Sequence, residues 1–171
     1  HMSEQEVAEF AKESLSDNGK TLDMTSTFLR EYGTKDLASF EFLKDLTKLE
    51  LGSNLMGPKG AKYLATSKVL INLTSLNLFY NNIGNEGAKY IAISDNLLSL
   101  ADLNLSDNNI TDEGAKELAK YLPLFTNLAK LDLRLNKINE EGKQALREAQ
   151  KLTKLKQLLL DAEEGFQVRS I

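Results

Sequence analysis

The sequence predicts an α/β solenoid in which short strands and helices alternate along one domain of 171 residues. The main observation is a period of 27 residues, broken once by a step of 28 residues. The central leucine of the pattern "LxxLxL" follows this period, at Leu22, Leu49, Leu76, Leu103, Leu131 and Leu158. Two further observations are the alternating leucines, which are typical of a strand, and the alanine-rich segment after each strand, which is typical of a helix. Strands that are separated by helices pair in parallel, so we expect a parallel sheet of about six strands.

An asparagine follows the strand pattern at a fixed distance in the central repeats. This column consists of Asn54, Asn81, Asn108 and Asn136, with Thr27 and Glu163 at its two ends. Backbone groups are buried where the chain leaves a strand, and a buried backbone group without a partner is costly. A side-chain amide offers both donors and an acceptor to such groups. We therefore expect these residues to form a structural asparagine ladder along the solenoid.

The helical half of each repeat reads "EGAKxLA", with a glycine in its first turn. Alanine and a larger aliphatic residue recur on one face, as at Ala88 and Ile91. The small alanines allow the helix to pack closely on the strands. A lysine follows the inward alanine in three repeats, at Lys62, Lys89 and Lys116. These lysines form either a solvated helix face or a basic binding stripe.

Composition shifts and the repeat period define the expected organisation of the chain. Residues 1–2 are expected to be a cloning scar. Residues 3–45 are expected to hold an N-terminal capping helix and a degenerate first repeat, and residues 46–154 four full repeats. A C-terminal capping strand and a tail are expected in residues 155–171.

Both ends depart from the pattern, because the terminal units of a repeat array must shield the core from water. Near the N-terminus, Val7 and Phe10 stand one period before Thr34 and Leu37, so this segment resembles the helix of a half repeat. Near the C-terminus, Lys143 and Arg147 replace alanines of the helix pattern. We expect that last helix to be less covered than the others.

Together, these columns resemble the leucine-rich repeat, L-x-x-L-x-L-x-x-N-x-[LI], from about Val7 to Leu160. The repeat length and the helical half are similar to those of the ribonuclease-inhibitor-like class. The resemblance implies a right-handed, curved solenoid with a parallel sheet on its concave side and α-helices on its convex side. The class includes ribonuclease inhibitors, Ran GTPase-activating proteins, innate immune sensors and many bacterial proteins. It therefore implies the fold more specifically than the function.

The composition argues against several classes of protein. Hydrophobic residues make up 42% of the chain and charged residues 27%, which indicates neither a disordered nor a membrane protein. A net charge of −4 argues against a nucleic-acid-binding surface. The absence of cysteine removes disulfides and thiolate metal sites. We expect a cytoplasmic location, or secretion into a host cytosol if the protein is a bacterial effector.

Two segments imitate ligand-binding loops. "GSNLMGPK" approaches a phosphate-binding loop, but Pro58 separates the glycine from the lysine and no Ser or Thr follows Lys59. The segment that begins at Asp107 imitates a calcium loop, yet its sixth position is Asp112 rather than glycine. The single histidine is His1, so the chain offers no native histidine for acid–base chemistry. We expect no enzyme activity and no cofactor.

The positions between the leucines face the concave side and are free to vary, so they form the candidate binding surface. One of these columns is polar to acidic throughout, at Asp23, Glu50, Asn77, Asn104 and Asp132. The middle repeats add larger side chains. The candidate partner-binding residues are Phe79, Tyr80, Asn77, Asn104, Asp107, Lys130, Asp132 and Arg134.

The large residues of this set allow two interpretations. Phe79 and Tyr80 either cover the edge between strand and loop or form the energetic centre of a binding surface. Because adjacent residues at a strand end point in different directions, we expect only one of them to lie fully on the concave face. Arg134 either contributes to binding or pairs with Asp107 or Asp161 on a neighbouring strand.

These observations favour a non-catalytic, monomeric module that binds a protein on its concave face, without a nucleic-acid or membrane partner. The acidic column favours a basic partner. Two alternatives remain open. One is a GTPase-activating protein, for which Arg134 is the candidate on the concave face. The other is the recognition domain of a bacterial effector.

Overall fold

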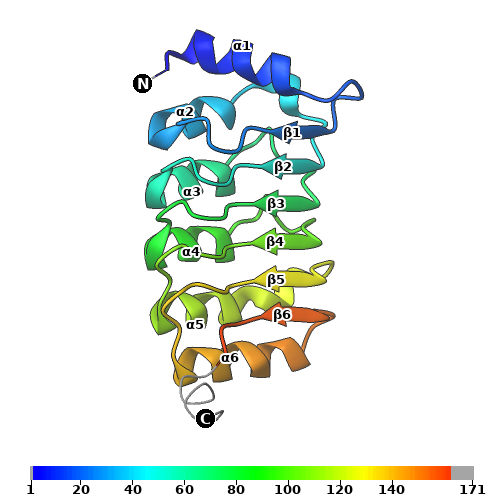
Figure 1. Ribbon diagram of the computed structural model, residues 1–171. Coiled ribbons are helices and arrows are strands. Elements are labelled where there is room, and N and C mark those ends of the chain that lie inside the picture. The colour runs from blue at the N-terminus through cyan, green and yellow to red at the C-terminus, as the bar shows by residue number, and fades with distance from the viewer. Residues whose placement is uncertain (1, 163–171) are drawn as a thin grey trace, which may run out of the picture.

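The structure, a computed structural model, describes residues 2–162. One sheet contains, in chain order, β1 (Thr21–Asp23), β2 (Lys48–Glu50), β3 (Ser75–Asn77), β4 (Asp102–Asn104), β5 (Lys130–Asp132) and β6 (Gln157–Leu159). The helices are α1 (Glu4–Ser14), α2 (Arg30–Leu37), α3 (Gly57–Ala65), α4 (Gly84–Ala92), α5 (Asp112–Tyr121) and α6 (Glu140–Lys151). Two short 3-10 helices, η1 (Glu41–Leu43) and η2 (Leu122–Leu124), lie on the returns from helix to strand. The strands stack in one column and α2 to α6 in a second, with α1 at the N-terminal end (Figure 1).

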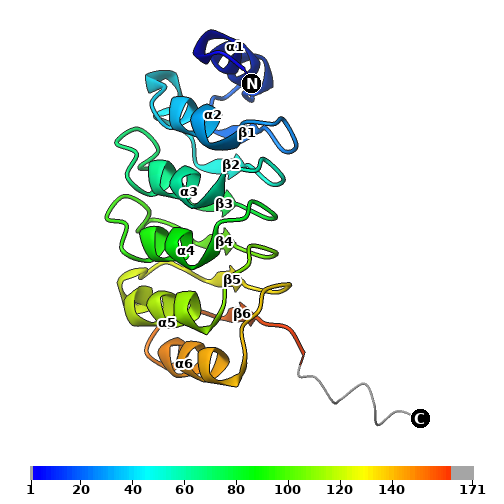
Figure 2. The ribbon, with the colours of Figure 1, turned by 90° about the vertical axis from the view of Figure 1, so that its left-hand side faces the viewer.

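All pairs of neighbouring strands are parallel, which confirms the predicted sheet. The central leucines are in register from Leu22 opposite Leu49 to Leu131 opposite Leu158. These leucines are buried between the sheet and the helices except Leu158, which is half-buried on the last strand. A view turned by 90° shows α2 to α6 on one side of the column of strands (Figure 2).

The glycine column lies within the first turn of each helix, because α3 to α6 begin two or three residues before their glycines. At Gly87, a Cβ atom would overlap the side chain of Ile83. A glycine here lets the buried isoleucine of the loop pack directly under the helix. Ala88 and Ile91, on the inward face of α4, are fully buried.

Neighbouring helices are also joined at their N-termini. The first backbone N–H groups of a helix have no partner within that helix. Asn85 Oδ1 in α4 accepts hydrogen bonds from Thr111 N and Gly114 N of the next repeat, both at 2.9 Å. Asp112 Oδ1 in α5 accepts from Asn139 N at 2.7 Å and from Gly142 N at 3.2 Å. Each of these side chains therefore caps the helix that follows its own.

The asparagine column connects one repeat to the next through hydrogen bonds. Asn81 is fully buried, and its Nδ2 donates to the carbonyls of Leu51 and Leu78 at 2.9 and 3.1 Å. Its Oδ1 accepts from Asn54 N at 2.9 Å, while its own N–H donates to Asn108 Oδ1 at 2.9 Å. The same bond joins Asn108 N to Asn136 Oδ1. The structure thus contains the ladder, and it satisfies the backbone groups that leave each strand.

Thr27 occupies the ladder position in the first repeat. Its Oγ1 donates to Met24 O at 2.7 Å, which replaces the bond that an asparagine Nδ2 makes to the equivalent carbonyl. Its N–H donates to Asn54 Oδ1 at 3.1 Å. A smaller side chain is sufficient here because no earlier ladder residue needs an acceptor. Glu163, in register at the other end, lies outside the described residues.

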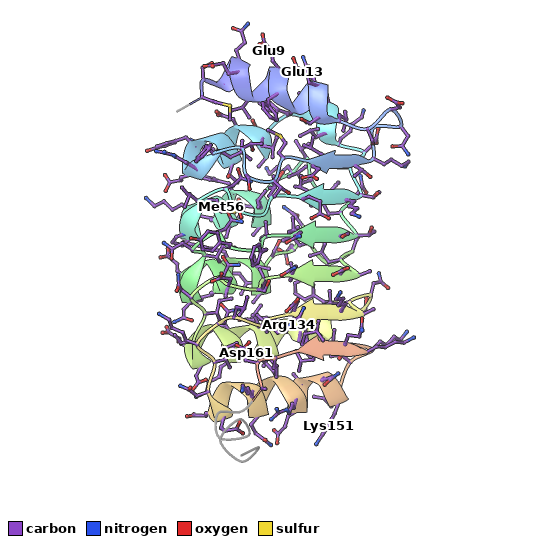
Figure 3. The ribbon with its side chains drawn as sticks, viewed as in Figure 1. Glu9, Glu13, Met56, Arg134, Lys151 and Asp161 are labelled. Carbon is purple, nitrogen blue, oxygen red and sulfur yellow. The ribbon has the colours of Figure 1, made fainter. Side chains whose placement is uncertain are left out.

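The N-terminal helix caps the solenoid but does not follow the register of the repeats. Val7 and Ala11 are buried, whereas Phe10 is exposed, so the expected alignment of Phe10 with Leu37 is wrong. The reason is the connection: α1 reaches β1 through an antiparallel bridge between Leu15 and Leu22, and no parallel strand sets its rotation. Glu9 and Glu13 point away from the solenoid (Figure 3). A capping box between Ser3 and Glu6 begins the helix.

The buried position of Asn81 leads to a test of the ladder. Asn81→Ala should lower the free energy of unfolding by about 1–3 kcal/mol, because buried carbonyl and N–H groups lose their partners. The control is Asn82→Gly: Asn82 is exposed at φ 52°, a conformation that glycine adopts without strain. Urea denaturation would measure both variants. Equal midpoints for the two variants would contradict a stabilising role of the ladder.

Candidate functional site

Side chains on the exposed side of the sheet, here called the strand face, form the first part of the candidate site. At the end of β3, Asn77 Oδ1 accepts a hydrogen bond from Phe79 N at 3.0 Å. At the end of β4, Asn104 Oδ1 accepts from Ser106 N at 2.9 Å and from Ser106 Oγ at 2.6 Å. Asn and Asp commonly bind their own backbone two residues on in this way. These side chains end the strands, and their acceptor oxygens are already bonded within the chain.

In the first repeat, Asp23 makes the same turn with Thr25. Its Oδ1 accepts from Thr25 N at 3.0 Å and from Thr25 Oγ1 at 2.6 Å. These hydrogen bonds hold the pKa of the Asp23 carboxyl below its ordinary value. Glu50 stands in the same column but instead approaches Lys48, with 3.9 Å between Lys48 Nζ and Glu50 Oε1. The polar to acidic column is thus mostly a set of strand-ending turns.

Asp132 and Arg134 form an ion pair within a single repeat. Arg134 Nε donates to Asp132 Oδ1 at 3.0 Å and Arg134 Nη2 to Asp132 Oδ2 at 2.8 Å. The interpretation in which Arg134 pairs with Asp107 or Asp161 is therefore wrong, because Arg134 pairs with Asp132, the last residue of β5. Asp132 is only 4% exposed, which also corrects its expected place among the open surface residues.

The ion pair changes the acidity of both groups. Burial acts to raise the pKa of the Asp132 carboxyl. The hydrogen bonds from Arg134 and the charges of Arg134 and Lys130 outweigh burial, so the pKa lies below its ordinary value. The same pairing raises the pKa of the Arg134 guanidinium. Asp132 therefore stays ionised and holds Arg134 in place at the end of β5. Arg134 and Asp161 are labelled in Figure 3.

Five repeats have a left-handed residue immediately before the ladder position, and we call this column the rim. It consists of Ser26, Ser53, Tyr80, Asp107 and Leu135, with φ between 54° and 58°. This conformation is unfavourable for bulky side chains and is most often taken by Gly, Asn or Asp. Tyr80 is 53% exposed and Leu135 is 62% exposed despite this preference.

The two central aromatic residues lie side by side but in different environments. Phe79 is half-buried at the end of the strand, while Tyr80 lies on the rim. Their ring centroids are 6.0 Å apart, with 39° between the planes. Gly52 lies beside Phe79, and a Cβ atom there would be in ordinary van der Waals contact with Phe79 Cβ, at 3.8 Å. The structure therefore divides the two roles: Phe79 partly covers the sheet, and Tyr80 presents its ring to solvent.

A second group of exposed apolar side chains was not predicted from the sequence. Phe28 and Leu55 directly follow the ladder position, also with positive φ, and Phe28 is 66% exposed. Leu55 lines a hollow of about 370 Å³ together with Tyr32 and residues 29–31. The aligned repeats could have indicated that this position is exposed, because the polar residues Asn82 and Asn109 occupy it in the next two repeats.

The lysines of the helix side pack on neighbouring side chains. Lys62 Nζ lies 5.6 Å from the ring centroid of Tyr90 on the next helix, and Lys35 Nζ lies at the same distance from that of Tyr63. Lys116 pairs with Glu141. Contacts of this kind join adjacent helices, and they favour a structural role over a basic binding stripe.

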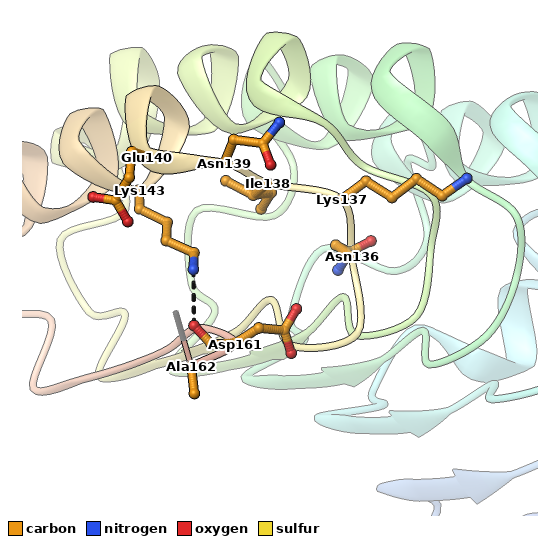
Figure 4. Close-up of a pocket in the computed structure, with 8 residues that line it drawn as sticks. All are labelled: Asn136, Lys137, Ile138, Asn139, Glu140, Lys143, Asp161 and Ala162. Atoms are coloured by element: carbon orange, nitrogen blue, oxygen red, sulfur yellow. Dashed lines mark hydrogen bonds between the residues drawn. The ribbon is translucent and has the colours of Figure 1, made fainter. Parts of the chain in front are cut away.

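The hollow at the C-terminal end has a volume of about 770 Å³ (Figure 4). Lys143 lies there and is only 6% exposed, so it is buried like the alanines of the other helices, and the expectation that it would be less covered is wrong. Arg147 is exposed, as expected. Lys143 Nζ donates to Asp161 O at 2.9 Å. Asp161 Oδ1 accepts from Leu135 N at 2.8 Å. Asp161 is thus bonded to α6 and to the rim residue Leu135.

The described residues contain no cluster of three or more His, Cys, Asp or Glu side chains that could hold a metal ion. Within residues 2–162, no helix is long and apolar enough to cross a membrane. The strand face and the rim carry aromatic, aliphatic and charged side chains.

The Asp132–Arg134 pair leads to a pH-dependent prediction. Asp132→Asn keeps an acceptor for Arg134 N, as Asn104 does for Ser106 N, but removes the charge; Asp132→Ala removes both. We expect a loss of about 1–3 kcal/mol for the alanine variant and about 0–1 kcal/mol for the asparagine variant at pH 7.

The sign of the pH effect follows from the lowered pKa of folded Asp132. Its stabilising contribution is present above the unfolded pKa of about 3.9 and is lost as the pH falls through the folded pKa. The stability difference between the native chain and Asp132→Asn should therefore shrink below about pH 4. Urea denaturation at pH 7, 4 and 3 would measure it. A difference that stays constant or grows would contradict the pairing.

Comparison with known proteins gives a family but no individual relative. A search of curated proteins finds no match to the chain. A family model described as a leucine-rich repeat matches residues 43–65, 69–92, 97–119 and 126–146, which together cover more than half of the chain. The matched spans coincide with the repeats that contain α3 to α6. The chain belongs to the leucine-rich repeat family.

Proposed function

We propose that this chain is a non-catalytic module that binds a protein partner through the strand face and the rim, around Phe79, Tyr80 and Arg134. Leucine-rich repeats generally mediate contacts between proteins. The observation that carries the proposal is the exposure of Tyr80 and Leu135 in a left-handed conformation. Bulky residues in such conformations cost conformational energy, and they persist where the surrounding structure and function require them.

The residues around Tyr80 are of the types that contribute most of the binding energy in protein interfaces. Exposed aromatic residues and arginine are enriched among the residues that dominate binding. Tyr80 offers an open ring, Phe79 supports it from the side, and Arg134 is held by the buried carboxylate of Asp132. A side chain that is already held in place loses little entropy when a partner binds.

A GTPase-activating function is the less favoured alternative. Such a protein supplies a positioned arginine or a similar group to the charge that develops on the transferred phosphate. Arg134 already uses Nε and Nη2 to bind Asp132, so fewer of its donors remain for a phosphate. Hydrolysis of GTP by a panel of small GTPases, with and without the chain, tests this alternative directly.

The test of the proposed function compares variants that the repeats themselves suggest. Tyr80→Ser introduces the residue that stands on the rim at Ser26 and Ser53, and Phe79→Ser introduces the residue found at Ser106. We expect both to bind the native partner, isolated by affinity capture from cells of the source organism, about 30-fold more weakly, the factor that corresponds to about 2 kcal/mol. Isothermal titration calorimetry would measure the affinities.

The controls are Lys89→Ala and Lys62→Ala on the helix side, which should leave the affinity unchanged. Thermal unfolding of each variant would show whether it is folded. If the helix-side variants lose the partner while Tyr80→Ser and Phe79→Ser keep it, the binding surface lies on the opposite side of the solenoid. Stimulated GTP hydrolysis that Arg134→Ala removes would replace the proposal by the alternative.

A further inference from the structure

Three neighbouring rim residues form a mixed surface that is apolar at both ends and acidic in the middle. Tyr80, Asp107 and Leu135 occupy the same position in three successive repeats, and their φ angles are 56°, 54° and 58°. Their shared backbone conformation sends the three side chains out from equivalent points, with a spacing close to the distance between strands of about 4.8 Å.

Backbone hydrogen bonds fix these three residues beside one another. Tyr80 N donates to Ser106 O at 3.1 Å, and Asp107 N donates to Arg134 O at 3.0 Å. Leu135 N donates to Asp161 Oδ1 at 2.8 Å. Because each residue is bonded to the next repeat, the spacing of the side chains does not depend on a flexible loop.

Within the described residues, the Asp107 carboxylate has no partner, unlike the carboxylates of Asp132 and Asp161. Among residues 2–162, its carboxylate makes no hydrogen bond and no ion pair. Asp132 is paired with Arg134, and Asp161 accepts a bond from Leu135 N. The half-buried Asp107 thus presents an uncompensated negative charge between an aromatic ring and an aliphatic side chain.

We propose that Tyr80, Asp107 and Leu135 form a subsite for an arginine side chain of the protein partner, an inference that rests on the proposed function. The Asp107 carboxylate would accept two hydrogen bonds from the planar guanidinium. The ring of Tyr80 would stack on the same group, since a cation over an aromatic face is attracted to it. The side chain of Leu135 would contact the aliphatic stem, which arginine buries readily.

The geometry favours arginine over lysine. A guanidinium can stack on a ring and bind a carboxylate bidentately at the same time, whereas an ammonium is a compact point charge that is strongly hydrated. A partner that fits this subsite therefore exposes an arginine within a surface that also covers Phe79. The subsite narrows the expected basic partner to one with an arginine at the centre of its contact surface.

The test titrates the full 15N-labelled chain with N-acetyl-arginine methylamide and follows the backbone amides by NMR. We expect shifts concentrated at residues 80, 107 and 135. Asp107→Asn, which keeps a residue suited to positive φ, should reduce the initial slope of these shifts about fivefold, the factor that an exposed ion pair supplies. N-acetyl-lysine methylamide should give smaller shifts, and the neutral N-acetyl-citrulline methylamide should give none.

The matched control is Asp102→Asn, which removes a carboxylate of the same repeat from the strand face, and it should leave the slopes unchanged. Shifts that spread over the acidic surface, or that persist in Asp107→Asn, would overturn the subsite. That outcome is separate from the fate of the proposed function, which the affinities of Phe79→Ser and Tyr80→Ser decide. If those variants lose the partner but the arginine amide causes no shifts at residues 80, 107 and 135, the chain is still a binding module. The proposed arginine of the partner would then be wrong.

Discussion

The hydrogen bonds of the buried asparagines are the interaction on which the rest of the structure depends. Where the chain leaves each strand, its carbonyl and N–H groups turn away from the sheet and are closed off from water by the neighbouring repeats. The amide of Asn81 satisfies carbonyls of two repeats and accepts an N–H of the previous one. Without these bonds, the turn would bury unpaired backbone groups, and the leucines of adjacent strands would lose their register.

The same turn creates the surface that we propose for binding. On each side of the buried asparagine the backbone is left-handed, and side chains such as Tyr80 and Phe28 therefore point away from the core. The ladder holds these positions rigidly, because its bonds fix the backbone on both sides. A constraint that stabilises the solenoid thus also presents exposed side chains in a defined row, one for each repeat.

The two ends of the described array differ from its central repeats. At the N-terminus, Thr27 completes the ladder with a hydroxyl, and α1 covers the core with Val7 and Ala11. At the C-terminal hollow, Lys143 fills an alanine position with its aliphatic stem and bonds to the Asp161 carbonyl with its amine. At Thr27 and at Lys143, a polar side-chain group bonds to a backbone carbonyl.

The sequence by itself determined the strands, the helices and the ladder, because burial follows the 27-residue period and periodic burial is visible in residue types. It could not show that Asn77, Asn104 and Asp132 use their oxygens within the chain, or that Arg134 pairs two residues back. Nor did it show the exposed left-handed positions of Phe28 and Tyr80. These features depend on backbone angles at the end of each strand, and packing between repeats sets those angles. Only the tertiary structure therefore separates the polar side chains that hold the fold from those that remain open to a partner.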